Sequence, residues 1–298
     1  MTAARGRVAV VVSVTDPSSI AGNGPSRFAE EVQGRGSVVF VDGTGTDSID
    51  PDPPAIRVVR GKIGALAPEL WRDGLRATDE PLVAFSTASM VPSPGWLDAL
   101  LARLDETNAA AVGGSIAPAE GLSITDRAVF LLRYANYLPP LPGTAVEPPG
   151  DNALYRRDRL EGLSALIDRG FWESEIHRGL RARGETLALA GGATLRFHGG
   201  SPLAVTLRQR FRHARSYGAS RGSRMKVLER LARSIAAPLV PAVLAWRIAR
   251  CLKMRGEPVA PWLSSALQLA GLSAAWTAGE TCGFWAIADT RQDLSDDS

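Results

Sequence analysis

Polar side chains that could hold a ligand follow two of the predicted strands in this chain. One set comes directly after the apolar run Pro81–Phe85, and the other follows the run Ser37–Val41. Strand ends in an α/β sheet meet at one edge, and such sheets bind ligands at the carboxyl edge. The side chains in question are the hydroxyls of Ser86, Thr87 and Ser89 and the carboxylates of Asp42 and Asp47.

Two further carboxylates, Glu173 and Glu175, come just before the predicted helix Ile176–Arg183. A carboxylate can accept a proton as a general base. Because the two residues are two positions apart, their side chains point in different directions once the segment enters a helix, and only one is expected to face a cleft. The alternative is a solvated helix N-terminus, where acidic side chains are electrostatically favoured.

The elements that must position these groups alternate between strand and helix. The run Val8–Val14 is almost entirely β-branched, which is typical of a strand buried on both faces. The alternation predicts an α/β fold with a mostly parallel sheet and helices on both faces. Further strands are predicted at Ser37–Val41, Ile56–Val59, Pro81–Phe85, Ala111–Ser115 and Thr194–Phe197, and helices at Phe28–Val32, Ala65–Ala77, from Leu97, and at Ile176–Arg183.

The glycines of Gly22-Asn23-Gly24 could suggest a dinucleotide-binding fingerprint. The third glycine of that fingerprint is missing, since Arg27 stands in its place, and the spacing from the preceding strand is too long. A Rossmann-type oxidoreductase is therefore the least favoured hypothesis.

The stretch Glu80–Trp96 resembles the core of the family 2 inverting glycosyltransferases, which are nucleotide-sugar enzymes of the GT-A fold. In that family a hydrophobic strand leads to an acidic metal-binding triplet, a proline, and a Pro-Gly-Trp-Leu sequence that opens a helix. This chain departs from the pattern at the triplet, where Thr87-Ala88-Ser89 contains no carboxylate. The resemblance covers roughly Val8 to Gly218. The matching residues are Pro92, Pro94, Gly95, Trp96 and Leu97.

The resemblance implies a set of site residues. The segment from Gly150 to Arg157 is similar to the family's segment beside the acceptor site, and Glu173-Ser174-Glu175 is similar to its acidic pair, of which one carboxylate serves as base. It implies Glu173 or Glu175 as catalytic residues, with Glu173 preferred by position. It implies nucleotide-sugar binding by Asp42, Asp47, Ser86, Thr87 and Ser89, and acceptor-side roles for Gly114, Asp151, Asn152 and Trp172.

The altered triplet also bears on the metal. A divalent cation, Mg or Mn, neutralises the leaving diphosphate in many family members, but the hydroxyls of Thr87 and Ser89 are poor substitutes for carboxylates. His198 is similar to a histidine that coordinates metal in some GT-A enzymes, although a lone histidine that closes a strand is more often structural. We therefore assign no metal site and expect metal-independent or weakly metal-dependent activity.

Composition narrows the class of protein. The chain has 298 residues, of which 45% are apolar, so a sizeable core is expected. The net charge of +3 does not imply nucleic acid as a partner, and Cys251 and Cys282 are too few for a disulfide framework. The short apolar run at Val8–Val14 predicts a strand and not a signal peptide.

The composition becomes strongly basic after Leu207. Arg208, Arg212 and Arg215 fall on one helical face, which suits either a diphosphate or lipid headgroups. The uncharged run Ser234–Trp246 is too short to span a bilayer, whereas Val259–Gly279 is long enough but diluted by polar residues. Ala278-Gly279-Glu280 and Gly283-Phe284 resemble a signature found near the end of family members.

These observations predict three regions: a GT-A-like domain over residues 1–220, a membrane-associated helical region over 221–288, and a disordered acidic tail over 289–298. The first hypothesis is a glycosyltransferase at the cytoplasmic face of the cell membrane that uses a nucleoside-diphosphate sugar and a lipid or cell-envelope polysaccharide acceptor. The second is a binding or partner protein that keeps the GT-A shell without its chemistry.

Overall fold

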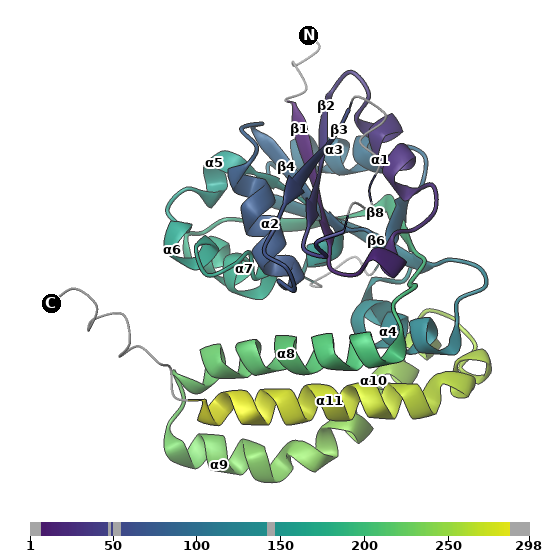
Figure 1. Ribbon diagram of the computed structural model, residues 1–298, viewed down its shortest axis with the longest axis vertical. Coiled ribbons are helices and arrows are strands. Elements are labelled where there is room, and N and C mark those ends of the chain that lie inside the picture. The colour runs from purple at the N-terminus through teal and green to yellow at the C-terminus, as the bar shows by residue number, and fades with distance from the viewer. Residues whose placement is uncertain (1–6, 47–48, 50–54, 142–146, 287–298) are drawn as a thin grey trace, which may run out of the picture. The chain divides into compact units, whose positions relative to one another are not determined.

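The computed structural model describes residues 7–46, 49, 55–141 and 147–286. The chain forms two compact units, residues 1–201 and 202–298 (Figure 1). The composition placed the boundary near residue 220, but helix α8 (Leu203–Gly222) runs through that position without interruption. Each unit is described by itself below.

The first unit is built on a sheet of eight strands in the order β3-β2-β1-β4-β7-β6-β8-β5. Strands β3, β2, β1 and β4 are mutually parallel, β7 is antiparallel to both neighbours, and β8 is parallel to β6. The strands are β1 (Val8–Val14), β2 (Gly36–Asp42), β3 (Ile56–Arg60), β4 (Leu82–Thr87), β5 (Met90–Pro92), β6 (Ala111–Pro118), β7 (Ala153–Arg156) and β8 (Leu187–Phe197). The predicted α/β fold with a mostly parallel sheet is confirmed.

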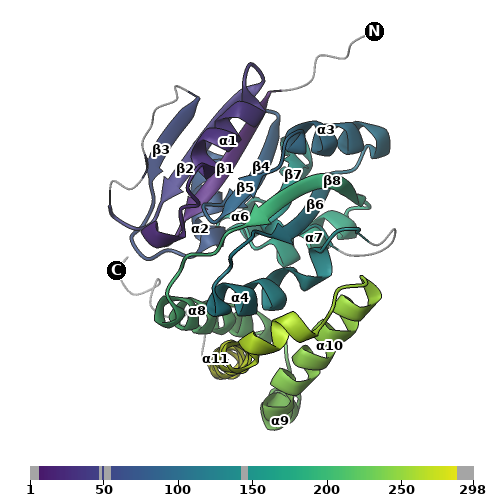
Figure 2. The ribbon, with the colours of Figure 1, turned by 90° about the vertical axis from the view of Figure 1, so that its right-hand side faces the viewer.

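Helices cover both faces of this sheet (Figures 1 and 2). On one face lie α2 (Ala67–Arg76), α5 (Arg157–Leu160), α6 (Ser164–Ile167) and α7 (Glu173–Ala182), and on the other lie α1 (Gly24–Val32) and α3 (Trp96–Thr107). Helix α4 (Ile124–Tyr134) and the short 3-10 helices η1 (Pro17–Ser19), η2 (Ala135–Tyr137) and η3 (Gly150–Asn152) complete the unit.

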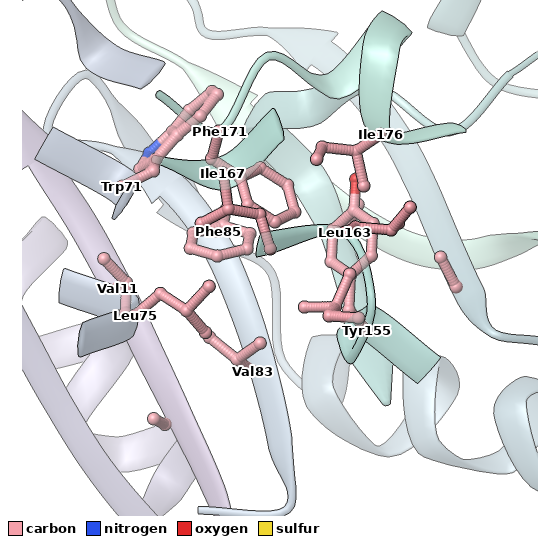
Figure 3. Packing of buried hydrophobic residues seen from close by; sticks show 14 of the residues in the cluster. Val11, Trp71, Leu75, Val83, Phe85, Tyr155, Leu163, Ile167, Phe171 and Ile176 are labelled. Carbon is pink, nitrogen blue, oxygen red and sulfur yellow. The ribbon is translucent and has the colours of Figure 1, made fainter. Parts of the chain in front are cut away.

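The core on the first of these faces centres on Phe85 of β4 (Figure 3). Its ring lies 4.3 Å from the ring of Phe171, 5.6 Å from that of Tyr155 and 5.8 Å from that of Trp71. The indole of Trp71 donates a hydrogen bond of 2.7 Å to the carbonyl of Ser86. These contacts anchor the segment before α7 to the last residues of β4.

Several elements were not predicted from the sequence. Prolines such as Pro92 and Pro94 disfavour a central strand, but Met90–Pro92 forms the edge strand β5, where a proline removes no needed hydrogen bond. Gly191 and Gly192 interrupt the strand pattern, but β8 continues through them, with a register shift opposite Gly114 and Ser115. Helix α4 was also missed, as was strand β7.

The second unit, in the described residues, is helical. Helix α11 (Ala266–Trp285) packs against α8, α9 (Val227–Ala236) and α10 (Val240–Met254), as Figure 1 also shows. The 3-10 turns η4 (Ala237–Leu239) and η5 (Ala260–Ser265) connect these helices. Cys251 and Cys282 are both free thiols.

Helices α8 and α11 approach each other through glycines. A Cβ atom added at Gly279 would lie 2.3 Å from the carbonyl oxygen of Phe211, and one at Gly283 would lie 2.3 Å from that of Arg215. On the facing helix, a Cβ at Gly218 would lie 2.3 Å from the carbonyl oxygen of Glu280. Small residues four apart on both helices therefore let the two backbones touch.

One helix among the described residues, Val227–Met254, is long and apolar enough to cross a membrane by length and composition. Only 11% of its apolar window is buried within the protein, so it is not a core helix. The stretch Val259–Gly279, which the sequence suggested as a span, is instead divided between η5 and α11. The helix Val227–Met254 consists of α9, the 3-10 turn η4 and α10. Pro238 and Pro241 lie in the first turns of η4 and α10, at the junction between the two α-helices, where a proline is tolerated.

The close helix contact predicts opposite effects for two glycines of α11. Gly279→Ala should destabilise the protein by about 1–3 kcal/mol, since the methyl group must force the helices apart. Gly271→Ala is the control, because nothing lies within 4 Å of an added Cβ there, and it should stabilise by up to about 1 kcal/mol through helix propensity. Equal midpoints in urea unfolding for the two variants would contradict this account.

Candidate functional site

The carboxyl ends of the central parallel strands define the candidate site. Val14 at the end of β1 pairs with Asp42 of β2, and Ser13 pairs with Thr87 of β4. Asp42 and Thr87 are thus separated by one strand, or about 10 Å at the usual strand spacing. The Asp42 side chain is 4% exposed, and its Oδ1 accepts hydrogen bonds from the backbone N–H of Thr44 at 2.7 Å and from its hydroxyl at 2.6 Å. Asp47 lies outside the described residues.

The triplet that replaces the acidic motif lies in the turn from β4 to β5. The hydroxyls of Thr87 and Ser89 hydrogen-bond each other at 3.0 Å, while Ala88 is buried. Ser86 is fully buried in the sheet, so its side chain lines the core and not the rim that was predicted for it. Its Oγ has no hydrogen-bond partner.

A divalent cation does not fit this donor set. Thr87 and Ser89 offer two neutral hydroxyls already engaged with each other, whereas Mg and Mn prefer carboxylate oxygens. Within the described residues, no cluster of three or more His, Cys, Asp or Glu side chains could hold a metal. The residues present therefore do not fit the metal that the fold family implies.

His198 does lie beside the triplet. Its backbone N–H donates to the carbonyl of Ser89 at 2.8 Å, at the end of the β5–β8 pair. The side chain is only partly covered, and this partial burial, followed by the charge of Arg196, lowers the pKa of its imidazole. His198 is thus neutral at pH 7 and could accept or donate a hydrogen bond at this edge.

Asp16 at the end of β1 belongs to the same edge and was not singled out in the sequence. It is 7% exposed, and its Oδ1 accepts hydrogen bonds from the backbone N–H of Ser18 at 3.0 Å and from its hydroxyl at 2.7 Å. Its Oδ2 is buried without a partner. The signal available in the sequence was an acid two residues after a buried strand.

The turn η3 lies against the end of β4 and is fixed by Asn152. Asn152 Oδ1 accepts from the indole N–H of Trp96 at 2.7 Å, and its Nδ2 donates to the carbonyls of Ser115 at 2.8 Å and Ala193 at 3.1 Å. The side chain is fully buried, so its groups contact protein and not the acceptor expected for it. Gly114 is also internal, because an added Cβ would lie 2.0 Å from the Ala193 carbonyl oxygen.

Asp151, the preceding residue of η3, is held by two side chains of α4. Its Oδ2 accepts from Arg133 Nη2 at 2.5 Å and from the hydroxyl of Tyr134. Asp151 is 4% exposed, and these charge-assisted hydrogen bonds compensate for the burial of its carboxylate.

Glu173, the first residue of α7, lies over this turn. An added Cβ at Gly150 would lie 3.0 Å from the Glu173 side chain. Burial, followed by the neighbouring charge of Asp151, raises the pKa of the Glu173 carboxyl group, against the opposing charges of His177 and Arg133. A half-buried carboxyl group with a raised pKa is the kind of group that acts as a base near neutral pH.

The second acid, Glu175, has a different environment. It forms an ion pair with Arg169 at 3.5 Å, and Trp172 donates its indole N–H to the Arg169 carbonyl. The two carboxylates therefore lie in different surroundings, as their two-residue spacing suggested. Of the pair, Glu173 is the one beside η3.

His177 of α7 is a buried polar residue beside this region. Its side chain is fully buried, its Nε2 lies 2.8 Å from the hydroxyl of Tyr155, and its Nδ1 lies 3.7 Å from Glu147. The amphipathic pattern of α7 places it on the inner face beside Ile176.

The predicted basic face lies in the second unit. Arg208, Arg212 and Arg215 are all exposed on α8. Their predicted contact with a diphosphate or with lipid headgroups stays a prediction.

Comparison with known proteins supports the fold. No family model and no curated protein sequence matches the chain. Among solved structures, the chain is similar to the mannosyltransferase PcManGT from Pyrobaculum calidifontis in complex with GDP-Man and Mn²⁺, with a TM-score of 0.53 and 18% identity. The match covers 91% of this chain and 86% of that one. The chain therefore has a glycosyltransferase-like α/β fold.

The raised pKa of Glu173 predicts that Glu173→Gln stabilises the folded protein. Above about pH 4.3 the unfolded state ionises this group more readily than the folded state does, so its ionisation reduces stability as the pH rises. The variant should therefore melt at a higher temperature than the native protein at pH 8, and the difference should shrink as the pH falls towards 4. Glu175→Gln is the control, and it should not raise the melting temperature. A Glu173→Gln variant that melts lower at pH 8 would count against the assignment.

Proposed function

We propose that this chain is a glycosyltransferase that moves a sugar from a nucleoside-diphosphate sugar to a lipid or polysaccharide acceptor at a membrane surface. The observation that carries the proposal is the position of Glu173 over η3, at the carboxyl edge of a glycosyltransferase-like sheet. The similar mannosyltransferase was solved with GDP-Man, which supports a nucleotide sugar as the donor.

In this mechanism Glu173 accepts the proton of the acceptor hydroxyl as that oxygen attacks the anomeric carbon of the donor. The new bond forms on the face opposite the leaving diphosphate, so the configuration at that carbon inverts. Asp151 acts through Glu173, because its fixed negative charge raises the proton affinity of the base. Arg133 and Tyr134 hold the Asp151 carboxylate in place through hydrogen bonds.

The donor nucleoside is assigned to the edge formed by Asp16 and Asp42. Each carboxylate uses its Oδ1 for a local turn, and none of the described groups donates to either Oδ2. Carboxylate oxygens accept hydrogen bonds from ribose hydroxyls or from N–H groups of a base. Thr87, Ser89 and His198 are proposed to contact the donor as neutral hydrogen-bonding groups, without a metal.

The first test measures transfer directly. Donor hydrolysis or transfer from a panel of UDP-, GDP- and dTDP-sugars should persist in EDTA, and Glu173→Gln should reduce it by about 10²–10⁴-fold. Activity of the native protein should rise with pH through the raised pKa of Glu173, because only the ionised carboxylate accepts a proton. Glu175→Gln serves as the matched control and should retain most of the activity. Loss of all activity in EDTA would refute metal independence.

The altered triplet favours one alternative, a catalytically inactive protein that keeps the shell of the fold to bind a ligand or partner. One experiment distinguishes the two hypotheses. If the native chain shows no turnover and Ala88→Asp together with Ser89→Asp creates Mn²⁺-dependent turnover, the alternative is correct. Turnover by the native chain excludes it.

The membrane location is proposed from the second unit. Eleven of the fourteen large apolar side chains that are exposed in the described residues lie between residues 227 and 285. The helix Val227–Met254 has only thirteen uncharged residues between Arg233 and Arg247, about 20 Å of helix, against a hydrocarbon core of about 30 Å. We infer that this helix lies along the bilayer surface.

A fractionation experiment tests the surface location. The protein should sediment with membranes after mild lysis and should be released by alkaline carbonate, because it is attached at the interface. Sedimentation with membranes after carbonate treatment would show that a helix spans the bilayer. Recovery entirely in the soluble fraction before that treatment would refute attachment.

A further inference from the structure

The surface of α10 carries a hollow that neither the fold nor the proposed reaction explains. It is an open depression of the surface with a volume of about 700 Å³. Its apolar lining comes from Trp246 and Ala249 of α10 and from Pro258 and Val259 of the following loop. All of these residues belong to the second unit.

The charged groups of the hollow are mainly cationic. Arg250 and Lys253 line it together with a single acid, Glu257. The guanidinium of Arg250 lies 5.6 Å from the centre of the Trp246 ring, so the cation is held over an aromatic face. Arg250 and Lys253 are both exposed and form no ion pair among the described residues.

The residue types on one face of the helix bear on the kind of ligand that the hollow suits. Leu239, Val243, Trp246, Arg250 and Lys253 follow one another at spacings of three or four, so they share one face. The face passes from exposed aliphatic side chains through an exposed tryptophan to two cations. In a helix that lies along the bilayer surface, such a face places its tryptophan at the interface and lets its lysine and arginine reach the headgroups.

The surrounding charge points to the same kind of ligand. Between Arg224 and Glu257 eight side chains are basic and two are acidic, Glu229 and Glu257. The basic residues are Arg224, Lys226, Arg230, Arg233, Arg247, Arg250, Lys253 and Arg255. An apolar hollow within a cationic surface complements a molecule with an anionic head and an apolar tail.

We propose that the hollow is a binding site for the phosphate headgroup of an anionic phospholipid in the bilayer. Arg250 and Lys253 contact the phosphate, and Trp246 with Val259 packs against the glycerol and upper acyl region. The inference concerns lipid binding, so it can hold even where the proposed transfer reaction fails, and its test does not use activity.

The test uses the full chain and vesicles of phosphatidylcholine, alone or mixed with phosphatidylglycerol. The native protein should sediment with the mixed vesicles far more than with the neutral ones. Arg250→Gln with Lys253→Gln should weaken binding to the mixed vesicles by about 25-fold, the product of about fivefold for each cation. Trp246→Ala should weaken binding to both kinds of vesicle.

Matched controls separate the hollow from total charge. Lys62→Gln with Arg178→Gln removes the same two charges from exposed positions of the first unit and should leave vesicle binding within about twofold of native. Ala249→Glu places an acid in the hollow and should weaken binding as strongly as the double variant. Thermal unfolding of every variant should match the native protein, which excludes misfolding as the cause.

Three results would overturn the proposal. The first is equal loss of binding in the two double variants, which would reduce the effect to net charge. The second is native binding that does not depend on phosphatidylglycerol. The third is release of the protein from mixed vesicles by millimolar glycerol phosphate at constant ionic strength, which would assign the hollow to a free phosphate ester.

Discussion

The site depends on the buried amide of Asn152. Its oxygen and both of its N–H groups are hydrogen-bonded, to the indole of Trp96 and to the carbonyls of Ser115 and Ala193. A buried amide that is fully satisfied in this way permits one orientation of the turn and penalises others. The turn η3 is thereby fixed against β4, with Asp151 presented on one side and Gly150 beneath Glu173. The residues of η3, which resemble a ligand-binding motif in the sequence, thus fix the structure of the site.

A buried side chain also fixes the start of α3. Gly95 adopts a left-handed conformation, with φ of 76°, and Glu31 of α1 caps the helix. The Glu31 carboxylate accepts the N–H groups of Gly95 and Leu97, each at 3.0 Å. A negative charge at a helix N-terminus is favourable, and this one is buried between two helices. Trp96 is therefore held rigidly, and through Asn152 so is the turn.

The carboxylates at the carboxyl edge of the sheet come from positions other than the acidic triplet. Asp16, Asp42 and Asp151 are buried and hydrogen-bonded, whereas Glu173 pays a burial penalty that raises its pKa. Acids with contrasting environments in one region are typical of sites that transfer protons. In the second unit the contrast is between buried glycine contacts and an exposed apolar, cationic surface. The glycine contacts fix the packing of the helices. The exposed apolar and cationic surface has the chemical character that suits a bilayer.

The sequence alone determined the alternation of strands and helices, because β-branched runs and helical spacing are local patterns, and it placed Asp42, Thr87 and Glu173 near the ends of elements. It missed β5 and the bulged part of β8, since proline and glycine normally end a strand and are tolerated here only at an edge and at a bulge. Only the tertiary structure decided which polar residues face inward. Ser86, Asn152 and His177 are buried because their neighbours in space supply hydrogen bonds or apolar contacts from segments far away in the chain. Contacts between distant segments are not encoded in local spacing. The raised pKa of Glu173 depends on contacts of the same kind.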